Sequence, residues 1–250
     1  MSNVAWDFAD RVVAVTGSAS GMGADAVGAF AAAGAEVYGL DIDEHKGAAV
    51  ASDAGARFLG CDVTDTTSVE AAFGRIENDA GRLDVLINNA GGFWHQHTTE
   101  SLPESEWDAV VDLNLKGVFL CTRRAMALLR RSTAGRIITL SSLAGQTAVY
   151  RSSPAYAAAK AGVLALSRVF AYELAADGVT SNAISPSAVM TDRIREVRGP
   201  DERARTEATI PLGRYGTTGE IVNWMLFLAS DEAAYMTGQT ITVNGGRLMV

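Results

Sequence analysis

A glycine-rich loop between an apolar run and a helical segment constrains this chain more than any other feature. Residues 12–15 predict a buried strand, residues 16–23 form the loop, and residues 22–33 have helical character before Gly34. A second apolar run at residues 36–40 completes a compact βαβ unit. Glycines in this position let a backbone approach a pyrophosphate, whose charge meets free N–H groups at the helix N-terminus. The loop therefore predicts a nucleotide site, although many such loops are only turns.

The same alternation of short apolar runs and helical segments continues to the C-terminus. Further strands are predicted at residues 56–59, 85–88, 136–140, 181–184 and 240–243, and helices near residues 45–54, 66–80, 104–131, 153–176 and 218–229. Strands that are apolar on both faces suit a parallel sheet covered by helices on each side. We expect an α/β fold: a doubly wound, Rossmann-like sheet of seven mainly parallel strands, with residues 1–250 as one domain.

Composition and charge exclude several classes of protein. With 48% hydrophobic residues and 5 prolines the chain is typical of a packed globule. A net charge of −8 disfavours nucleic acid or an anionic membrane as a partner. Asp7 and Asp10 have the wrong charge for a signal peptide, and no apolar stretch could span a bilayer, so we expect a cytoplasmic protein. Cys61 and Cys121 are predicted to be core thiols rather than disulfide or metal ligands.

Asp41 strengthens the prediction of a nucleotide site. It ends the second predicted strand, 24 residues after Gly17, where a carboxylate can accept hydrogen bonds from the adenosine ribose hydroxyls. The same charge would repel a 2′-phosphate, and neither Ser18 nor Ile42 is a basic residue that could bind one. The pattern favours NAD over NADP, while the alternative for Asp41 alone is a solvated charge at a strand end.

Tyr156 and Lys160 lie four residues apart in an alanine-rich helical segment, which places them on one face of the helix. An ammonium beside a phenol stabilises its ionised form and suits it to acid–base chemistry near neutral pH. Alone, such a pair is more often an exposed surface contact. Ser142 follows the strand at residues 136–140, at the carboxyl edge where ligands of such sheets bind, and could hold a carbonyl oxygen. Asn114 sits inside a long apolar helix and needs a partner there.

Together these residues resemble the short-chain dehydrogenase/reductase family. The matching features occur in the family's order over essentially the whole chain: residues 16–23, Asp62, residues 88–91, Asn114, Ser142, Tyr156, Lys160, Thr237, Gly238, Gly245 and Gly246. The resemblance implies a catalytic tetrad in which Tyr156 is the acid–base and Ser142 orients the carbonyl. Lys160 would hold the nicotinamide ribose and lower the phenol pKa, and Asn114 would position a water that links Lys160 to solvent.

The resemblance also implies the residues that bind the cofactor. Asp62 and Val63 would meet the adenine, and Asn89 to Gly91 would line the ribose, while Val189 and Thr191 would contact the carboxamide. The full expected set is Gly17, Ser20, Gly21, Met22, Gly23, Asp41, Asp62, Val63, Asn89, Ala90, Gly91, Tyr156, Lys160, Pro186, Val189 and Thr191. The chain departs from the family where Ser187 follows Pro186 in place of the usual glycine, so that a side chain stands where the backbone commonly approaches the nicotinamide. The segment between Ser142 and Tyr156 is also one residue longer than in many relatives.

Aromatic side chains dominate the predicted substrate pocket. Its expected wall comprises Phe93, Trp94, His95, Leu143, Val149 and Tyr150. Such a wall favours a bulky apolar or aromatic secondary alcohol or ketone over a polyol. The alternative is that Phe93 and Trp94 pack in the core. His95 and His97 could suggest a metal pair, but the sequence indicates no third ligand, so no metal is expected.

The expected function is NAD-dependent interconversion of a secondary alcohol and a ketone, that is, an alcohol dehydrogenase or ketone reductase. Residues 190–210 resemble the family's mobile substrate lid. The resemblance also implies a homotetramer that pairs the long fifth and sixth helices. One alternative is a ketoacyl-thioester reductase. Asp41 counts against it because such enzymes usually use NADPH, and the net charge of −8 counts against it because the carrier protein is itself acidic. Another is a non-catalytic nucleotide-binding protein, which an intact tetrad disfavours.

Overall fold

A parallel sheet forms the centre of the computed structural model, which describes residues 4–149 and 152–249. Within these residues seven strands lie in the order β3-β2-β1-β4-β5-β6-β9, and every neighbouring pair is parallel. Their bounds are β1 Val12–Thr16, β2 Glu36–Asp41, β3 Arg57–Gly60, β4 Val85–Asn88, β5 Arg136–Leu140, β6 Thr180–Pro186 and β9 Thr240–Val243. The predicted doubly wound sheet of seven strands is confirmed. The direction of winding reverses between β1 and β4, which marks the edge where such sheets bind ligands.

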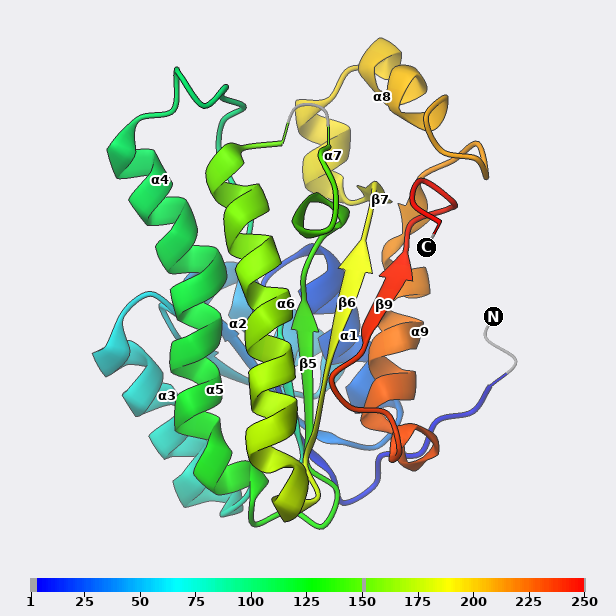
Figure 1. Cartoon of the computed structure of the whole chain (residues 1–250). Coiled ribbons are helices and arrows are strands. Elements are labelled where there is room, and N and C mark those ends of the chain that lie inside the picture. The colour runs from blue at the N-terminus through cyan, green and yellow to red at the C-terminus, as the bar shows by residue number, and fades with distance from the viewer. Residues whose placement is uncertain (1–3, 150–151, 250) are drawn as a thin grey trace.

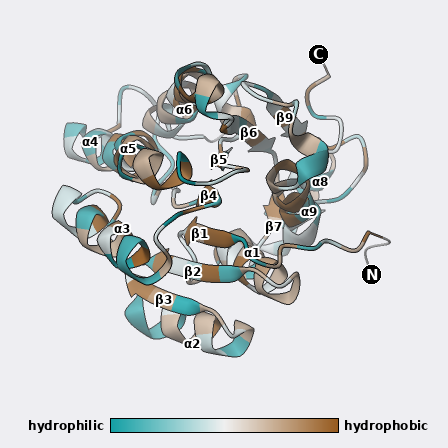
Figure 2. Ribbon diagram, turned by 90° about the horizontal axis from the view of Figure 1, so that it is seen from below, coloured by the Kyte–Doolittle hydropathy of each residue, from teal (hydrophilic) through white to brown (hydrophobic). Residues whose placement is uncertain are grey.

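Helices cover both faces of this sheet (Figures 1 and 2). One layer contains α1 Gly21–Ala32, α2 Glu44–Ala54 and α9 Thr218–Ala229, and the other contains α3 Thr66–Ala80, α5 Gly117–Leu129 and α6 Pro154–Leu174. Alternate residues of β1 pack against opposite helix layers. Val12 and Ala14 pack toward α3, α5 and α6, whereas Val13 and Val15 pack toward α1 and α9. This two-sided burial explains why the strand has no polar face. Cys61 and Cys121 are buried free thiols, as predicted.

The segment expected as one helix at residues 104–131 changes its winding part way along. It consists of α4 Glu104–Val111, a π-helical turn Asp112–Lys116, and then α5. Asn114 is at the centre of that turn. A wider turn of this kind is often found at functional sites, and hydrophobic periodicity does not reveal it.

Two short helices and a small second sheet follow β6, and the sequence pattern did not indicate them. They are β7 Val189–Met190, α7 Asp192–Val197, α8 Pro200–Glu207 and β8 Gly216–Thr217, with β7 and β8 paired in parallel. Figure 1 shows α7 and α8 beyond the arrowheads of β6 and β9, at the carboxyl edge of the main sheet. Across the described ranges, none of the helices has the length and apolar character needed to cross a membrane.

Candidate active site

The loop after β1 is packed so tightly that Gly17 and Gly23 leave no room for a side chain. Gly17 has a φ of +68°, and a Cβ added there would lie 2.8 Å from the Cα of Ala90. A Cβ on Gly23 would lie 2.0 Å from the Gly17 carbonyl oxygen. Ser20, the N-cap of α1, makes no side-chain cap, and the first turn carries no acidic residue. The N-terminal N–H groups of α1, which include those of Gly21 and Met22, are thus available to an anion.

Asn89 and Thr16 hold this loop in place. The Asn89 amide donates hydrogen bonds of 3.0 Å to the carbonyl oxygens of both Thr16 and Gly17. The Thr16 hydroxyl accepts from the backbone N–H groups of Asn89 and Ala90, at 3.0 and 3.1 Å. The side chain of Asn89, which the resemblance places along the ribose, therefore binds the loop itself. Thr16 was not among the expected site residues, although a hydroxyl that ends β1 is visible in the sequence.

Asp41 lies at the end of β2 and turns its carboxylate toward the same loop. One oxygen accepts from the Ala19 N–H and the other from the Asp43 N–H, both at 2.9 Å. The carboxylate remains partly exposed at the sheet edge, where its further lone pairs can accept hydroxyl groups. At the end of β3, Asp62 accepts from the N–H and the hydroxyl of Thr64, and Val63 is buried.

Ser142, Tyr156 and Lys160 come together at the carboxyl end of β5. Ser142 caps the short turn Leu143–Gly145, which packs so closely on α6 that a Cβ on Gly145 would lie 2.6 Å from the backbone of Lys160. Lys160 is buried, and its ammonium donates to the Leu140 carbonyl at 2.6 Å and lies 5.7 Å from the centre of the Tyr156 ring. The hydroxyl of Ser141, which was not predicted from the sequence, donates to the Lys160 carbonyl at 2.8 Å.

Burial dominates the acid–base properties of this cluster. It raises the pKa of Tyr156, and a hydrogen bond with Ser142 opposes that rise. It also lowers the pKa of Lys160 from 10.5 to about 8, because the charged form loses its hydration. In the protein alone the desolvation of Tyr156 is the larger effect and Ser142 opposes it, while the expected lowering of the phenol pKa by Lys160 stays a prediction.

Asn114 is fully buried and binds backbone groups on two sides. Its amide nitrogen donates to the carbonyl oxygens of Gly92 and Val110 at 2.7 and 2.8 Å, and its oxygen accepts from the Gly92 N–H at 2.9 Å. A Cβ on Gly91 would lie 2.6 Å from that oxygen and 3.1 Å from the Lys160 nitrogen. The glycine therefore lets the loop after β4 pass close to both Asn114 and Lys160.

Phe93 and Trp94, expected in the pocket wall, lie outside the core. The Phe93 ring is partly exposed and its centre lies 4.9 Å from that of Tyr156, while Trp94 is 52% exposed. The alternative that both pack in the core is therefore wrong. Leu143 is buried beside Ser142 and Val149 is half-buried, whereas Tyr150, also expected in the wall, lies outside the described residues.

His95 is close to His97, and both contact Glu106 in α4, which the sequence did not indicate as a partner. The imidazole of His95 is largely exposed, whereas Glu106 is mostly buried. A separation of nine to eleven residues across a loop gives no periodic signal from which that contact could have been predicted.

The segment after β6 is close to the glycine-rich loop. The methyl group of Thr191 would contact a Cβ on Gly21 at 3.6 Å, and Val189 is buried. Ser187, which follows the buried Pro186, accepts a 2.8 Å hydrogen bond from Arg247. The hydroxyl is thus directed to the C-terminal segment, and the expected effect of this side chain on the nicotinamide position stays a prediction.

These residues fit a dinucleotide. The free helix N-terminus suits a pyrophosphate, the glycine cradle leaves room for close backbone approach, and the carboxylate of Asp41 suits ribose hydroxyls. Tyr156, Ser142 and Lys160 stand at the same edge of the sheet, where a carbonyl or an alcohol could exchange a proton with the phenol.

Comparisons with known proteins agree with this geometry. A family model described as enoyl-(acyl carrier protein) reductase matches residues 17–247. The 3-oxoacyl-[acyl-carrier-protein] reductase FabG of Escherichia coli (strain K12) is 37% identical over 246 residues, which cover 98% of this chain and 100% of that protein. A protein of the same name from Staphylococcus aureus (strain Mu50) is 41% identical over 192 residues, 76% of each chain.

Solved structures are similar over nearly the whole chain. The crystal structure of gox2181 has a TM-score of 0.93 and 31% identity, with 96% of each chain covered. A short-chain type dehydrogenase/reductase from Mycobacterium ulcerans has a TM-score of 0.92 and 28% identity, covering 96% of this chain and 90% of that one.

Proposed function

This chain belongs to the short-chain dehydrogenase/reductase family, and we propose that it is an NAD(H)-dependent oxidoreductase that interconverts the ketone of a 3-oxoacyl thioester and the matching secondary alcohol. The observation that carries the chemistry is the buried cluster of Ser142, Tyr156 and Lys160. The likeness to 3-oxoacyl-[acyl-carrier-protein] reductases supports the substrate class, and it favours the thioester alternative over a simple alcohol or ketone.

The chain's own residues would bind the substrate and move the proton. A bound nicotinamide dinucleotide supplies the hydride in reduction and accepts it in oxidation. Ser142 would hold the carbonyl oxygen by its hydroxyl, and Tyr156 would donate its phenolic proton to that oxygen as the hydride reaches the carbon. In oxidation the same phenolate takes the proton back from the alcohol. Lys160 would hold the ribose and supply positive charge beside the phenolate.

Replacement of the phenol tests this assignment. Tyr156→Phe should lower kcat by about 10²–10⁴-fold, the usual contribution of a positioned acid–base group. Binding of NADH, followed by fluorescence titration, should stay close to wild type because the ring is retained. Turnover near that of the wild-type protein would contradict the role of Tyr156, and loss of NADH binding would show that the phenolic hydroxyl serves the nucleotide instead.

Asp41 supports NAD as the cofactor. Its carboxylate is anchored by the N–H groups of Ala19 and Asp43, so it is held at the strand end rather than free in solvent. A fixed negative charge there accepts ribose hydroxyls and repels a 2′-phosphate. Steady-state rates with NADH and NADPH at equal concentrations test the assignment, because preference for NADPH would contradict it.

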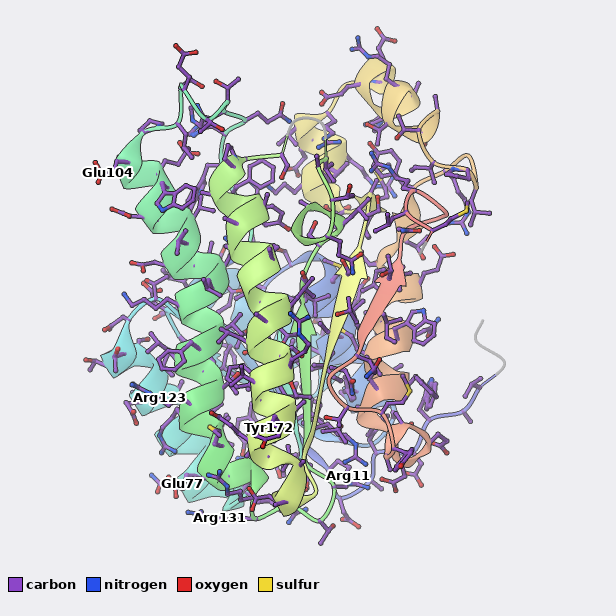
Figure 3. All side chains as sticks on the ribbon, in the orientation of Figure 1. Arg11, Glu77, Glu104, Arg123, Arg131 and Tyr172 are labelled. Carbon is purple, nitrogen blue, oxygen red and sulfur yellow. The ribbon has the colours of Figure 1, made fainter. Side chains whose placement is uncertain are left out.

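The surface charge argues for a small thioester over a large acidic carrier. Two basic side chains on the α3, α5 and α6 side of the sheet are tied to carboxylates: Arg124 binds Glu70 and Glu77, and Arg131 binds Glu77 at 2.8 Å. Figure 3 shows Glu77 and Arg131 together at one end of the molecule. Since the net charge is −8, we expect coenzyme A or pantetheine thioesters to be reduced at least as well as a carrier-bound substrate.

A bulky aromatic ketone is the second candidate, and the contact between Phe93 and Tyr156 favours it. A flat substrate could lie on the Phe93 ring beside the phenol, with Trp94 available at the entrance. A panel of 3-oxoacyl thioesters and aryl ketones, each run with NADH and NADPH, separates the two candidates by kcat/KM. The likeness to thioester reductases predicts that the thioesters are preferred.

We also propose that residues 190–210 act as a lid and that the enzyme is a homotetramer. Arg193 in α7 donates to the Phe93 carbonyl at 2.8 Å, so the lid segment already touches the pocket wall. On the outer helices, Phe119 of α5 is 40% exposed and Tyr172 of α6 is 88% exposed. Figure 3 shows Tyr172 on α6 and Arg123, which covers the Phe119 ring, on α5. Apolar side chains exposed on two long helices are typical of an interface between subunits.

A further inference from the structure

A cluster of two histidines and one glutamate lies on the loop after β4. His95 and His97 are on this loop, and Glu106 is in the first turn of α4, whose first residue, Glu104, is labelled in Figure 3. Nδ1 of His95 lies 3.2 Å, and Nε2 of His97 lies 3.0 Å, from the same carboxylate oxygen, Oε2 of Glu106. All three atoms lie within 4.8 Å of one another.

This spacing matches the ligands of a tetrahedral metal ion. A zinc ion bound at 2.0–2.1 Å by nitrogen and oxygen holds neighbouring ligand atoms about 3.3 Å apart. Two edges of the triangle, at 3.2 and 3.0 Å, already have nearly that length. The third edge, between the two imidazole nitrogens, is at most 4.8 Å, and the largely exposed side chain of His95 can turn to shorten it.

Hydrogen bonding within the cluster leaves one of its oxygens unused. Both imidazoles contact Oε2 of Glu106, whereas Oε1 is buried and, among the described residues, has no hydrogen-bond partner. A buried oxygen without a partner is costly, and a cation beside the carboxylate would bind one or both oxygens.

We propose that His95, His97 and Glu106 form a binding site for a divalent first-row transition metal ion, with Zn²⁺ as the best fit. Two imidazoles and a carboxylate select such an ion over Mg²⁺ or Ca²⁺, which prefer oxygen ligands alone. The exposed side of His95 leaves further coordination positions to water. The ion would tie the loop to α4 and thereby fix Phe93, two residues before His95, against Tyr156. It takes no part in the hydride transfer.

Metal titration of the untagged full-length protein tests this site independently of its activity. ZnCl₂ is titrated by calorimetry at pH 7.5, and CoCl₂ by visible absorption, which reports a tetrahedral nitrogen and oxygen environment. We expect one equivalent per chain. His97→Ala and Glu106→Gln should each weaken binding by at least about tenfold. The matched control is His45→Ala, because His45 is the one remaining histidine in the sequence and is exposed on α2.

The Gln variant separates metal binding from folding. Glu106→Gln keeps a carbonyl oxygen that can accept from both imidazoles but removes the anionic ligand, so its circular dichroism and melting temperature without metal should match the wild-type protein. The proposal is overturned if the wild-type protein binds no Zn²⁺ at 100 μM, if Glu106→Gln binds as tightly as wild type, or if His45→Ala removes the binding.

Discussion

The buried ammonium of Lys160 destabilises the protein at neutral pH, and Lys160→Met should reveal by how much. Burial lowers the pKa of Lys160 from 10.5 to about 8, a difference of about 2.5 units. At 1.36 kcal/mol per unit, the charged form costs the folded state about 3 kcal/mol at pH 7. Methionine has a similar length and no charge, so it avoids this cost. It also leaves the Leu140 carbonyl without the hydrogen bond that Lys160 donates at 2.6 Å, and this loss destabilises the variant by about 1 kcal/mol. We expect the variant to be about 2 kcal/mol more stable at pH 7 and inactive.

The pH dependence gives the sharper form of this prediction. An amine whose pKa is lower in the folded chain binds more protons when unfolded, so stability rises with pH from about 8 to about 10.5. Only the wild-type protein has this pH-dependent contribution to stability, because methionine does not ionise. The stability advantage of Lys160→Met should therefore shrink by about 2 kcal/mol between pH 7 and pH 9.5. The raised pKa values of the thiols of Cys61 and Cys121 act in the opposite direction, but they cancel in the difference between the two proteins.

Urea unfolding followed by circular dichroism measures both quantities. All samples are kept at one protein concentration, because subunit association couples stability to concentration. Lys46→Met is the matched control: Lys46 is exposed on α2, so its free energy of unfolding should stay within about 0.5 kcal/mol of wild type at each pH. The reasoning is refuted if Lys160→Met is less stable than wild type at pH 7, or if its advantage does not change with pH.

Three further predictions concern the loop, the cofactor and the assembly. Gly23→Ala should lower the free energy of unfolding in urea by at least about 1–3 kcal/mol, since the new Cβ would lie 2.0 Å from the Gly17 carbonyl oxygen. The control is Gly28→Ala in the same helix: its Cβ would meet no described atom within 4 Å, so this variant should be slightly more stable than wild type. Asp41→Asn keeps an acceptor oxygen but loses the charge, so the ratio of kcat/KM for NADP to that for NAD should rise at least about tenfold; an unchanged ratio would exclude Asp41 as the selecting group. Tyr172→Glu places a charge on the exposed face of α6 and should lower the mass found by light scattering; an undiminished mass would place the interface elsewhere.

The sheet and the nucleotide loop were predictable because local sequence determines them. A strand buried on both faces is an uninterrupted apolar run, and parallel strands bring the residues after their carboxyl ends to one edge. Asp41 and Ser142 could therefore be placed at the same edge of the sheet from the order of the elements alone. The acid–base balance of the cluster could not, since the pKa of Tyr156 is raised by burial of the ring, which its spacing from Lys160 in the sequence does not reveal.

Contacts across loops were beyond the reach of pattern analysis. The approach of Glu106 to the histidines depends on the path of the loop after β4, which has no period to read. The same holds for Ser187, whose hydroxyl is occupied by Arg247, 60 residues further along the chain. Both contacts arise from tertiary packing, which brings together side chains whose positions in the sequence do not indicate that they meet.

Asn114 lies in an irregular turn in the middle of a buried helix and binds the loop after β4. The Val110 carbonyl, one helical turn before Asn114, accepts the side-chain amide at 2.8 Å, and the backbone at Asp112–Lys116 winds as a π-helix. The other two hydrogen bonds of the side chain go to both polar groups of Gly92. The turn thus converts an unfavourable mid-helix residue into an anchor for the loop that begins at β4. Since that loop carries Phe93 to the Tyr156 ring, the irregular turn and the shape of the pocket depend on the same side chain.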